Sequence, residues 1–423
     1  MKIDIWNNIF DKYDILENIK NHGKFEITSR EINKFREARL MTKFDNASQL
    51  PDIFSKNKLS ILPTTRGSYV IAPMKIFQEL PKIEHDDSIS YFNFPEHIQS
   101  LSPENLSSET LALNAAYISG ILEDFIQDEK LLPTINGKMS SLAFNFQIKN
   151  SVTKQDLSVN VNKALIEIDA AYEGIETLSI IEAKNHLSDD FVIRQLYYPY
   201  RRLLTSGIVK KIKTIFMAYT NNIFYLYEYE FNDMKNYNSL VLTKFKKYSF
   251  EKLNIDIDDI EHIIDTTSLE KEPEISFPQA DSFERVINLC ELLDKKDLSK
   301  NDITQVYGFD KRQTDYYLSA LKYLQLIEEN HKKFSLSGIG KSIMRKSPRQ
   351  RQLSFVKQIL KRPVFNETLR EQLKTGNITP KTKIIEIMKK NNLYNVESES
   401  TFHRRASTVN SWVDWITSLT QNF

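Results

Sequence analysis

Cysteine is almost absent from this sequence, which limits the chemistry available to it. Cys290 is the only cysteine among 423 residues, so the chain can form neither an intramolecular disulfide nor a thiolate zinc cage. Long apolar runs are also missing, because no segment approaches the roughly 20 uninterrupted apolar residues of a membrane-spanning helix. Charged residues interrupt positions 1–20, where the apolar core of a secretory signal would lie. We therefore expect a cytoplasmic protein.

Charge is nearly balanced overall but unevenly distributed along the chain. The formal net charge is +1, yet residues 281–423 hold 25 Lys and Arg against 16 Asp and Glu, a balance of +9. Residues 1–280 carry the opposite balance of −8. A basic C-terminal part on an acidic body favours a polyanion as the partner. A basic solvated face that binds no nucleic acid is the alternative.

The pattern of apolar runs and breakers indicates several domains. The share of hydrophobic residues, 41%, is typical of folded globular proteins. The predicted parts are a mixed α+β domain at 1–95, an α/β domain at 96–265, a polar linker at 266–280, a winged-helix domain at 281–345 and a helical domain at 346–423. The winged-helix prediction depends on three helical segments followed by a short hairpin. The last part is compatible with a second, degenerate helix-turn-helix module.

The order of helical and strand-like segments in residues 96–265 predicts the fold class α/β. A helix over 107–127, with Ser107 or Ser108 as its N-cap, precedes four strand-like runs: LAFNFQIK, LSVNV, ALIEIDAAY and TLSIIEAK. A helix over 189–204 follows, and then the strand-like runs IKTIFMAYT and NIFYLYEYEF. This order predicts a mixed, largely antiparallel sheet flanked by helices.

Charged residues stand near the ends of two runs that are otherwise apolar. If ALIEIDAAY and TLSIIEAK pair as a hairpin around the turn GIET, Asp169 lies opposite Glu182, about 5 Å away at the β-carbon. Glu182 and Lys184 then point to the same side of the sheet, and Glu167 shares the side of Asp169. Carboxylates so placed repel one another unless a cation neutralises them. Mg²⁺ prefers carboxylate oxygen ligands, so we expect a magnesium site that Mn²⁺ can also occupy.

Such a cluster is suited to hydrolysis of a phosphodiester. A bound metal ion can polarise a phosphoryl oxygen and acidify a water, while Lys184 orients or helps to deprotonate that water. The alternative is an exposed strand end with a cross-strand salt bridge. The isoleucines on both runs favour a buried strand pair, where charges without a role are costly. We therefore expect the metal site.

The spacing of these residues resembles a known motif. Asp169, followed after twelve residues by Glu182-Ala183-Lys184, is similar to the PD-(D/E)XK nuclease motif, with Ile168 where the motif's proline often stands. The resemblance implies that Asp169 and Glu182 bind Mg²⁺ and that the carbonyl of Ala183 joins them. It also implies that Lys184 serves the attacking water.

The flanking helices add candidate residues to the resemblance. Gln195 resembles the glutamine of recombination-type nucleases of this superfamily, although Pro199 stands where their tyrosine is expected. Glu109 precedes the sheet, where the family sometimes supplies a further acidic ligand; a solvated helix residue is the alternative. Three arginines could lie along a groove for the DNA backbone: Arg194, Arg201 and Arg202.

The arrangement of parts resembles a subgroup of type II restriction endonucleases. In that subgroup an N-terminal domain, a PD-(D/E)XK core and a C-terminal winged helix occur together. The resemblance implies sequence-specific cleavage of double-stranded DNA by a homodimer or a transient dimer. It also implies a DNA methyltransferase in the same restriction-modification system, which protects the host genome.

The segment DKRQTDYYLSALKYL is the best candidate for a helix that enters a DNA groove. Its first turn would carry Lys311, Arg312, Gln313 and Thr314, at the end that usually meets base edges. Arginine can read guanine and glutamine can read adenine. Contact with phosphates only, or a dimer interface, is the alternative. Arg404 and Arg405 belong to a second basic segment, for which phosphate contact or simple solvation is expected.

Two other functions compete with a restriction endonuclease. Gln195 and its aromatic neighbours are compatible with a structure-specific repair or recombination nuclease. A non-catalytic winged-helix regulator is the rival of another class, and in it the hairpin charges would form only a salt bridge. Cleavage of plasmid into discrete fragments, preference for branched DNA, and binding without cleavage distinguish the three.

Overall fold

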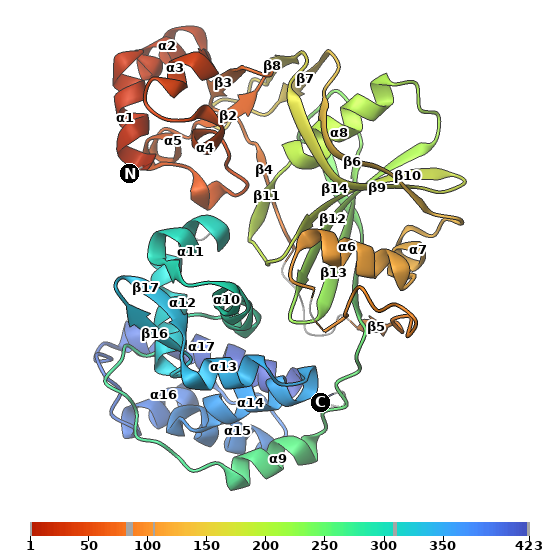
Figure 1. Ribbon diagram of the computed structural model, residues 1–423. Coiled ribbons are helices and arrows are strands. Elements are labelled where there is room, and N and C mark those ends of the chain that lie inside the picture. Colours follow the sequence, from red (N-terminus) through yellow and green to blue (C-terminus); the bar gives the residue numbers. More distant parts are fainter. Residues whose placement is uncertain (1, 82–87, 105, 308–310, 421–423) are drawn as a thin grey trace. The chain divides into compact units, whose positions relative to one another are not determined.

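The computed structural model divides into two compact units (Figure 1). The described residues are 2–81, 88–104, 106–307 and 311–420. The first unit comprises residues 1–219 and 223–248, and the second comprises 220–222 and 249–423. No helix in the described ranges is long and apolar enough to cross a membrane.

The first unit begins with short helices around a small sheet. The helices are α1 (Lys2–Lys12), α2 (Ile15–His22), α3 (Ser29–Asn33), α4 (Ala38–Met41), the 3₁₀ turn η1 (Ala47–Gln49) and α5 (Asp52–Lys56). The antiparallel strands, in the order β1-β3-β2, are β1 (Phe25–Thr28), β2 (Ser60–Pro63) and β3 (Ser68–Ala72). Trp6, Phe10 and Phe54 pack edge to face in its core. The indole N–H of Trp6 donates to the carbonyl of Met41 at 3.2 Å, which satisfies the one polar atom of this cluster.

A seven-stranded mixed sheet forms the centre of the first unit, so the α/β class is confirmed. Its order is β5-β14-β13-β12-β10-β9-β6. The strands are β5 (Ile89–Tyr91), β6 (Leu132–Ser140), β9 (Leu165–Glu173), β10 (Thr177–Lys184), β12 (Lys211–Thr220), β13 (Ile223–Phe231) and β14 (Leu240–Ser249). β10 and β12 run parallel, whereas β9 runs antiparallel to both β10 and β6. Two smaller sheets pair β7 (Phe144–Ile148) with β8 (Leu157–Val161), and β4 (Phe77–Glu79) with β11 (Asp190–Val192).

The predicted helices of this unit are interrupted where the sequence suggested continuity. The helix expected over 107–127 is divided into α6 (Glu109–Ile118) and α7 (Ile121–Ile126), because Gly120 takes a left-handed conformation with φ of 82°. The helix expected over 189–204 begins later, as α8 (Arg194–Thr205), since β11 occupies its first residues. Ser108 is the N-cap of α6 and accepts from the Leu111 N–H at 3.2 Å.

Helices cover both faces of the β9–β10 pair. Leu203 of α8 packs with Leu178 and Ile180, which point to one face of β10. Tyr172 lies opposite Ser179 and therefore points to the other face, where its ring contacts Tyr117 of α6 with centroids 5.0 Å apart. In Figure 1, α6 lies in front of the sheet.

The β9–β10 hairpin has the predicted register. Its ladder runs one for one from Leu178↔Glu173 to Ile181↔Ala170, which brings Asp169 to the end of the ladder beside Glu182. On its other side β9 is irregular against β6: between Ile135↔Ala171 and Gly137↔Ile168, β9 advances three residues while β6 advances two. Asp169 lies in this bulge. Bulges re-aim side chains and are common next to active sites.

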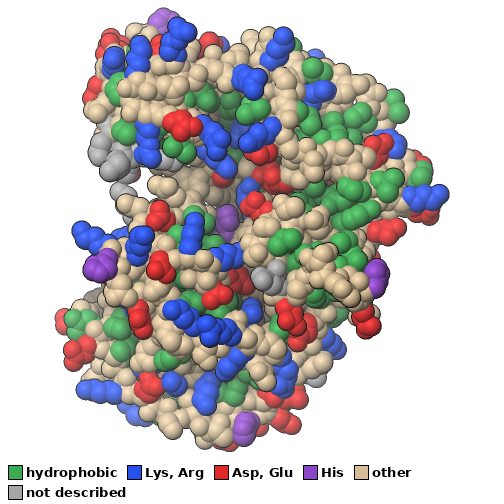
Figure 2. All heavy atoms as spheres, in the orientation of Figure 1, with side chains coloured by type: hydrophobic (Ala, Val, Ile, Leu, Met, Phe, Trp, Pro, Cys, Tyr) green, Lys and Arg blue, Asp and Glu red, His purple; other side chains and the backbone are tan. Residues whose placement is uncertain are grey.

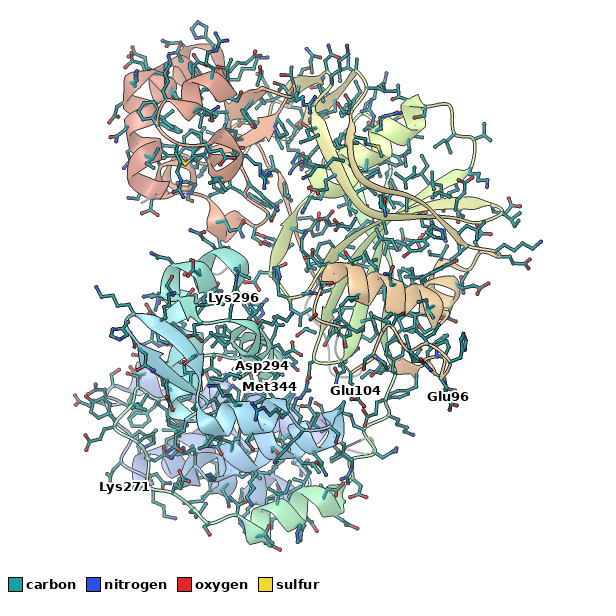
Figure 3. All side chains as sticks on the ribbon, in the orientation of Figure 1. Glu96, Glu104, Lys271, Asp294, Lys296 and Met344 are labelled. Carbon is teal, nitrogen blue, oxygen red and sulfur yellow. The ribbon has the colours of Figure 1, made fainter. Side chains whose placement is uncertain are left out.

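The second unit consists mostly of helices around one hydrophobic core. The helices are α9 (Ile257–Thr266), α10 (Phe283–Lys295), α11 (Lys300–Tyr307), α12 (Lys311–Tyr323), α13 (Gly338–Met344), α14 (Pro348–Leu360), α15 (Pro363–Thr375), α16 (Lys381–Lys390) and α17 (Glu399–Ser418). Its antiparallel strands, in the order β15-β17-β16, are β15 (Leu298–Ser299), β16 (Ile327–Asn330) and β17 (Lys333–Leu336). The core continues past Met344 at the end of α13, so the boundary expected between 281–345 and 346–423 does not separate two cores (Figure 3).

The prediction that residues 266–280 form a polar linker is wrong, because part of this segment is buried. Phe277 and Ala280 are buried, and the Phe277 ring stacks on Phe365 with centroids 5.7 Å apart. The hydroxyl of Tyr323 donates to Glu272 at 2.5 Å. Two buried apolar residues and polar contacts of Glu270 and Glu272 hold this segment against the core. Helix α9, which the sequence placed at the end of the 96–265 domain, also belongs to the second unit, because its isoleucines join that core.

Candidate active site at the β9–β10 hairpin

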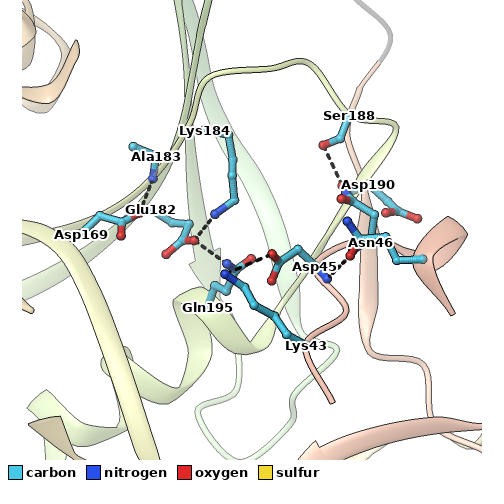
Figure 4. A network of polar contacts seen from close by, with 11 residues as sticks. Lys43, Asp45, Asn46, Asp169, Glu182, Ala183, Lys184, Ser188, Asp190 and Gln195 are labelled. Carbon is cyan, nitrogen blue, oxygen red and sulfur yellow. Dashed lines mark hydrogen bonds and ion pairs between the residues drawn. The ribbon is translucent and has the colours of Figure 1, made fainter. Parts of the chain in front are cut away.

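Strand β10 carries the central pair of charges. Oε1 of Glu182 accepts hydrogen bonds from Nζ of Lys184 and from Nε2 of Gln195, at the start of α8 (Figure 4). The side chains of Glu182 and Lys184 are only 7% and 14% exposed. The alternative of an exposed salt bridge at a strand end therefore does not describe this pair.

Asp169 is held against the same strand by the backbone. Its Oδ2 accepts from the N–H of Ala183 at 2.9 Å, so its carboxylate lies beside the peptide that joins Glu182 to Lys184 (Figure 4). The β9 bulge supplies the local geometry for this contact. The structure thus brings together Asp169, Glu182, Lys184 and Gln195, as the sequence predicted.

Several carboxyl groups interact with the single ammonium group of Lys184, so negative charge exceeds positive charge at this pair. Burial raises the pKa of Glu182 to about 7, against the attraction of Lys184 and with the repulsion of Asp169. Burial alone would lower the pKa of Lys184, but the attraction of Glu182, Asp45, Glu109 and Asp169 outweighs it, so that pKa is raised. Lys184 is therefore an ammonium surrounded by several carboxyl groups.

Glu109 faces this cluster from the first turn of α6. It is half-buried; burial raises its pKa, the attraction of Lys184 lowers it, and the repulsion of Asp169 raises it further. The alternative of a fully solvated helix residue does not hold for it. Glu167 does not join the group: its side chain is 61% exposed and lies 3.7 Å from Nζ of Lys138.

Asp45, between α4 and η1, is a residue at the site that the sequence did not reveal. It contributes to the electrostatic environment of both Glu182 and Lys184. The N–H of Val192 in β11 donates to the carbonyl of Asp45 at 2.9 Å, which ties this segment to the sheet region. Only the tertiary pairing with β11 brings Asp45 here, and no spacing in the sequence signals it.

The residues present fit a hard divalent cation. Asp169 and Glu182 supply carboxylate oxygens, and two further buried oxygens, Oδ1 of Asp45 and Oε1 of Gln195, have no hydrogen-bond partner among the described residues. Within those residues, no group of three or more His, Cys, Asp or Glu side chains is arranged to hold a metal. The carboxylates of Asp169 and Glu182 are therefore the charged oxygen donors that this site offers to a cation.

Three family models match successive parts of the chain. Each is described as a domain of unknown function: DUF6996 at residues 3–71, DUF6997 at residues 72–249 and DUF7226 at residues 285–421. No curated protein and no solved structure matches the chain. The β9–β10 site lies within the second match, whereas Asp45 lies within the first.

The arginines of α8 do not form the expected groove. The prediction that Arg201 lies along a groove for the DNA backbone is wrong. Arg201 is buried, and its Nη1 donates to the carbonyls of Asn145 at 2.9 Å and Met234 at 2.7 Å. Its guanidinium satisfies backbone carbonyls and is not available to a phosphate. Arg202 donates from Nε to the carbonyl of Ser140 at 3.1 Å. Arg194 is half-buried at the start of the helix.

In the first turn of α12, fewer of the predicted DNA-binding side chains are exposed to solvent than the sequence suggested. The prediction that Thr314 contacts DNA is wrong, because Thr314 is fully buried and its hydroxyl lies 2.9 Å from that of Thr304. Arg312 is exposed and contacts Tyr316, while Gln313 is half-buried. The side chain of Lys311 lies outside the described residues.

Some basic side chains elsewhere in the second unit already bond to other residues of the protein. Arg404 is exposed, but the Nη1 of Arg405 donates to Gln279 at 2.6 Å. The Nη2 of Arg349 lies 2.6 Å from Asp259 of α9. Figure 2 shows Lys and Arg side chains interspersed with Asp and Glu on the face in view.

Proposed function

We propose that this protein is a metal-dependent, sequence-specific endodeoxyribonuclease of the type II restriction class. The observation that carries the proposal is the buried Glu182–Lys184 pair, with Asp169 fixed on the N–H between them. Buried ion pairs are weak evidence for stability, because desolvation offsets their attraction. Strongly perturbed ionisable groups gathered at one place favour a functional site.

The excess of acid argues for a cation that joins the group. Around one ammonium lie Glu182, Asp169, Glu109 and Asp45, and burial raises the pKa of Glu182 to about 7. A structural salt bridge would need one carboxylate. Mg²⁺, or Mn²⁺ in its place, matches the hard oxygen donors, with Asp169, Glu182 and the carbonyl of Ala183 as its ligands.

The roles of the residues follow from their contacts. The metal ion would polarise the scissile phosphoryl group and acidify a water. The Ala183 N–H orients the Asp169 carboxylate, and the amide of Gln195 orients that of Glu182. Lys184 is charged and lies next to Glu182, where it can orient the attacking water and stabilise charge on the phosphate.

The order of elements supports the same proposal. A helix, the β9–β10 hairpin, a crossover through α8 and a parallel strand β12 are the arrangement that the PD-(D/E)XK resemblance implies. In the second unit the order α10, β15, α11, α12, β16, β17 is compatible with the winged helix that we propose for this part. We propose that this part binds DNA and that a homodimer cuts both strands. A restriction role also requires a methyltransferase that protects the host DNA.

A repair or recombination nuclease is the second candidate. The hydrogen bond from Gln195 to Glu182 favours it, because the glutamine is part of the site and not only of the helix. Pro199 is buried in α8 and supplies no hydroxyl where that class has a tyrosine.

Plasmid digestion tests the proposal. With Mg²⁺ the wild-type protein should give discrete fragments, and EDTA should stop the reaction. Asp169→Asn, Glu182→Gln and Lys184→Ala should each lower the rate by more than tenfold, which is about 1.4 kcal/mol of barrier, while duplex binding persists. A matched control is Glu167→Gln on the same strand, which should cut normally because Glu167 is exposed and lies outside the cluster.

The outcomes separate the candidates. Discrete fragments support a restriction enzyme, and preferential cutting of branched DNA supports the second candidate. Binding without cleavage by the wild-type protein would contradict both and favour a winged-helix regulator. A variant at Asp169 or Glu182 that cuts within tenfold of the wild-type rate would contradict the site.

A further inference from the structure

Asp45 is a partly unsatisfied acid that the proposed reaction does not yet use. Its side chain is 20% exposed, and its Oδ1 is buried without a hydrogen-bond partner among the residues that the structure describes. The other oxygen, Oδ2, lies 3.6 Å from Nζ of Lys43, whose side chain is 67% exposed. A buried acceptor without a partner is costly, so we expect a hydrogen-bond donor or a cation to reach Oδ1 when the protein works.

The backbone around Asp45 is fixed from both sides. The N–H of Asp45 donates to Oε1 of Gln49 at 2.7 Å, and its carbonyl accepts from Val192 at 2.9 Å. The next residues are tied to β11 as well, because the Ala47 N–H donates to Oδ1 of Asp190 at 3.0 Å. Since β11 leads directly into α8, one short strand positions both Asp45 and Gln195.

Lys184 needs a second anionic partner if Glu182 binds a metal ion. In the structure Oε1 of Glu182 accepts both Lys184 and Gln195, and that carboxylate is the one the proposed function assigns to the metal. Of the acids other than Glu182, Asp45 raises the pKa of Lys184 more than Glu109 or Asp169 does. Figure 4 shows the Asp45 carboxylate beside the Glu182–Lys184 pair.

We propose that Asp45 is a positioning residue for Lys184, so that the N-terminal segment completes the active site. Its carboxylate holds the ammonium in place while Glu182 and Asp169 serve the metal. The inference rests on the proposed function for the role of Lys184. The attraction between Asp45 and Lys184 is testable without any cleavage.

A double-mutant cycle tests the attraction between Asp45 and Lys184 in full-length protein without metal. Asp45→Asn keeps the shape of the side chain and removes its charge. Its effect on the urea midpoint is measured in the wild type and in Lys184→Met. Because Asp45 attracts Lys184, Asp45→Asn should be less favourable when Lys184 is present than when it is replaced. Equal shifts in both backgrounds would overturn the proposal, whatever the protein cleaves.

Cleavage and metal binding then test the role. Asp45→Asn should lower the single-turnover rate by more than tenfold, Asp45→Glu should restore part of it, and the Kd for duplex DNA should stay within twofold. Calorimetric titration with Ca²⁺ alone should give nearly the wild-type affinity for Asp45→Asn and a loss for Asp169→Asn. Asp11→Asn is the control, since Asp11 is an exposed aspartate on α1.

The opposite results are decisive. If Asp45→Asn cuts at the wild-type rate, or loses Ca²⁺ binding as fully as Asp169→Asn, Asp45 does not act through Lys184. A wild-type protein that neither binds Ca²⁺ nor cuts would contradict the proposed function itself, and the urea cycle would still decide whether the two side chains interact.

Discussion

Asp128 fixes the turn of the β9–β10 hairpin, at the end remote from the candidate active site, and its removal tests this part of the fold. Its Oδ2 accepts from both the N–H and the hydroxyl of Thr177, each at 2.7 Å. Its Oδ1 accepts from the N–H of Ile175 at 3.2 Å and from that of Glu176 at 3.3 Å. One carboxylate thus satisfies the donors of a turn that lies about ten residues from Lys184.

The magnitude follows from these contacts. The two short bonds to Thr177 contribute roughly 1 kcal/mol each, and the bonds to Oδ1 add little because they are long, at 3.2 and 3.3 Å. Asp128→Ala should therefore destabilise the turn by about 2 kcal/mol, or roughly 30-fold in its opening equilibrium. Hydrogen exchange of the amides of residues 174–177, followed by mass spectrometry, measures this opening directly.

The effect should depend on pH with a known sign. Burial would raise the pKa of Asp128, but the hydrogen bonds from Thr177 and neighbouring N–H groups outweigh it and lower the pKa from 3.8. The stabilisation is therefore present above pH 3.8 and is lost as the pH falls through the folded-state pKa. Exchange rates of wild type and Asp128→Ala should converge there, after correction for intrinsic exchange.

A neighbouring residue provides the control. Glu129 is exposed, and Glu129→Ala should leave the exchange of the turn unchanged. If Asp128→Ala changes the exchange less than threefold at neutral pH, the carboxylate does not hold the turn, and the reasoning fails.

Three further predictions concern burial. Cys290 is buried and its thiol pKa is raised, so a disulfide reagent should label it only in urea; rapid labelling of the folded protein would contradict the packing of α10. Arg201→Met should lower the free energy of unfolding by about 3 kcal/mol in urea titrations, because it leaves buried carbonyls unpaired, and DNA binding should not change. A fragment of residues 249–423 should unfold at a higher urea midpoint than one of 281–423, which lacks α9 and Phe277; equal midpoints would show that these pieces do not support the core.

The sequence predicted the hairpin and its charges because that information is local. Two β-branched runs around a short turn specify a ladder, and the alternation of a strand places Glu182 and Lys184 on one side. The N-cap of α6 was readable for the same reason. Strands β6 and β14 were missed, since Pro133 and Gly137 interrupt the first and lysines dominate the second.

Tertiary contacts account for what could not be predicted. Asp45 reaches the site because β11 binds its backbone, and nothing near it in the sequence encodes that pairing. Arg201 and Thr314 stand in polar stretches typical of exposed helix faces, but each bonds to a group from another element. The orientation of a helix about its axis is uncertain when aromatic residues surround it, as in α8.

The dispersion of the site along the chain has a consequence during synthesis on the ribosome. Asp45, Glu109, Asp169, Lys184 and Gln195 come from five separate segments, and β10 gains its parallel neighbour β12 only when residues 211–220 have been made. A nascent chain that stops before β12 lacks the strand that neighbours β10 in the sheet, so β10 and its charged side chains then lie at a sheet edge. The proposed nuclease would therefore lack its complete sheet until residues 211–220 have been made.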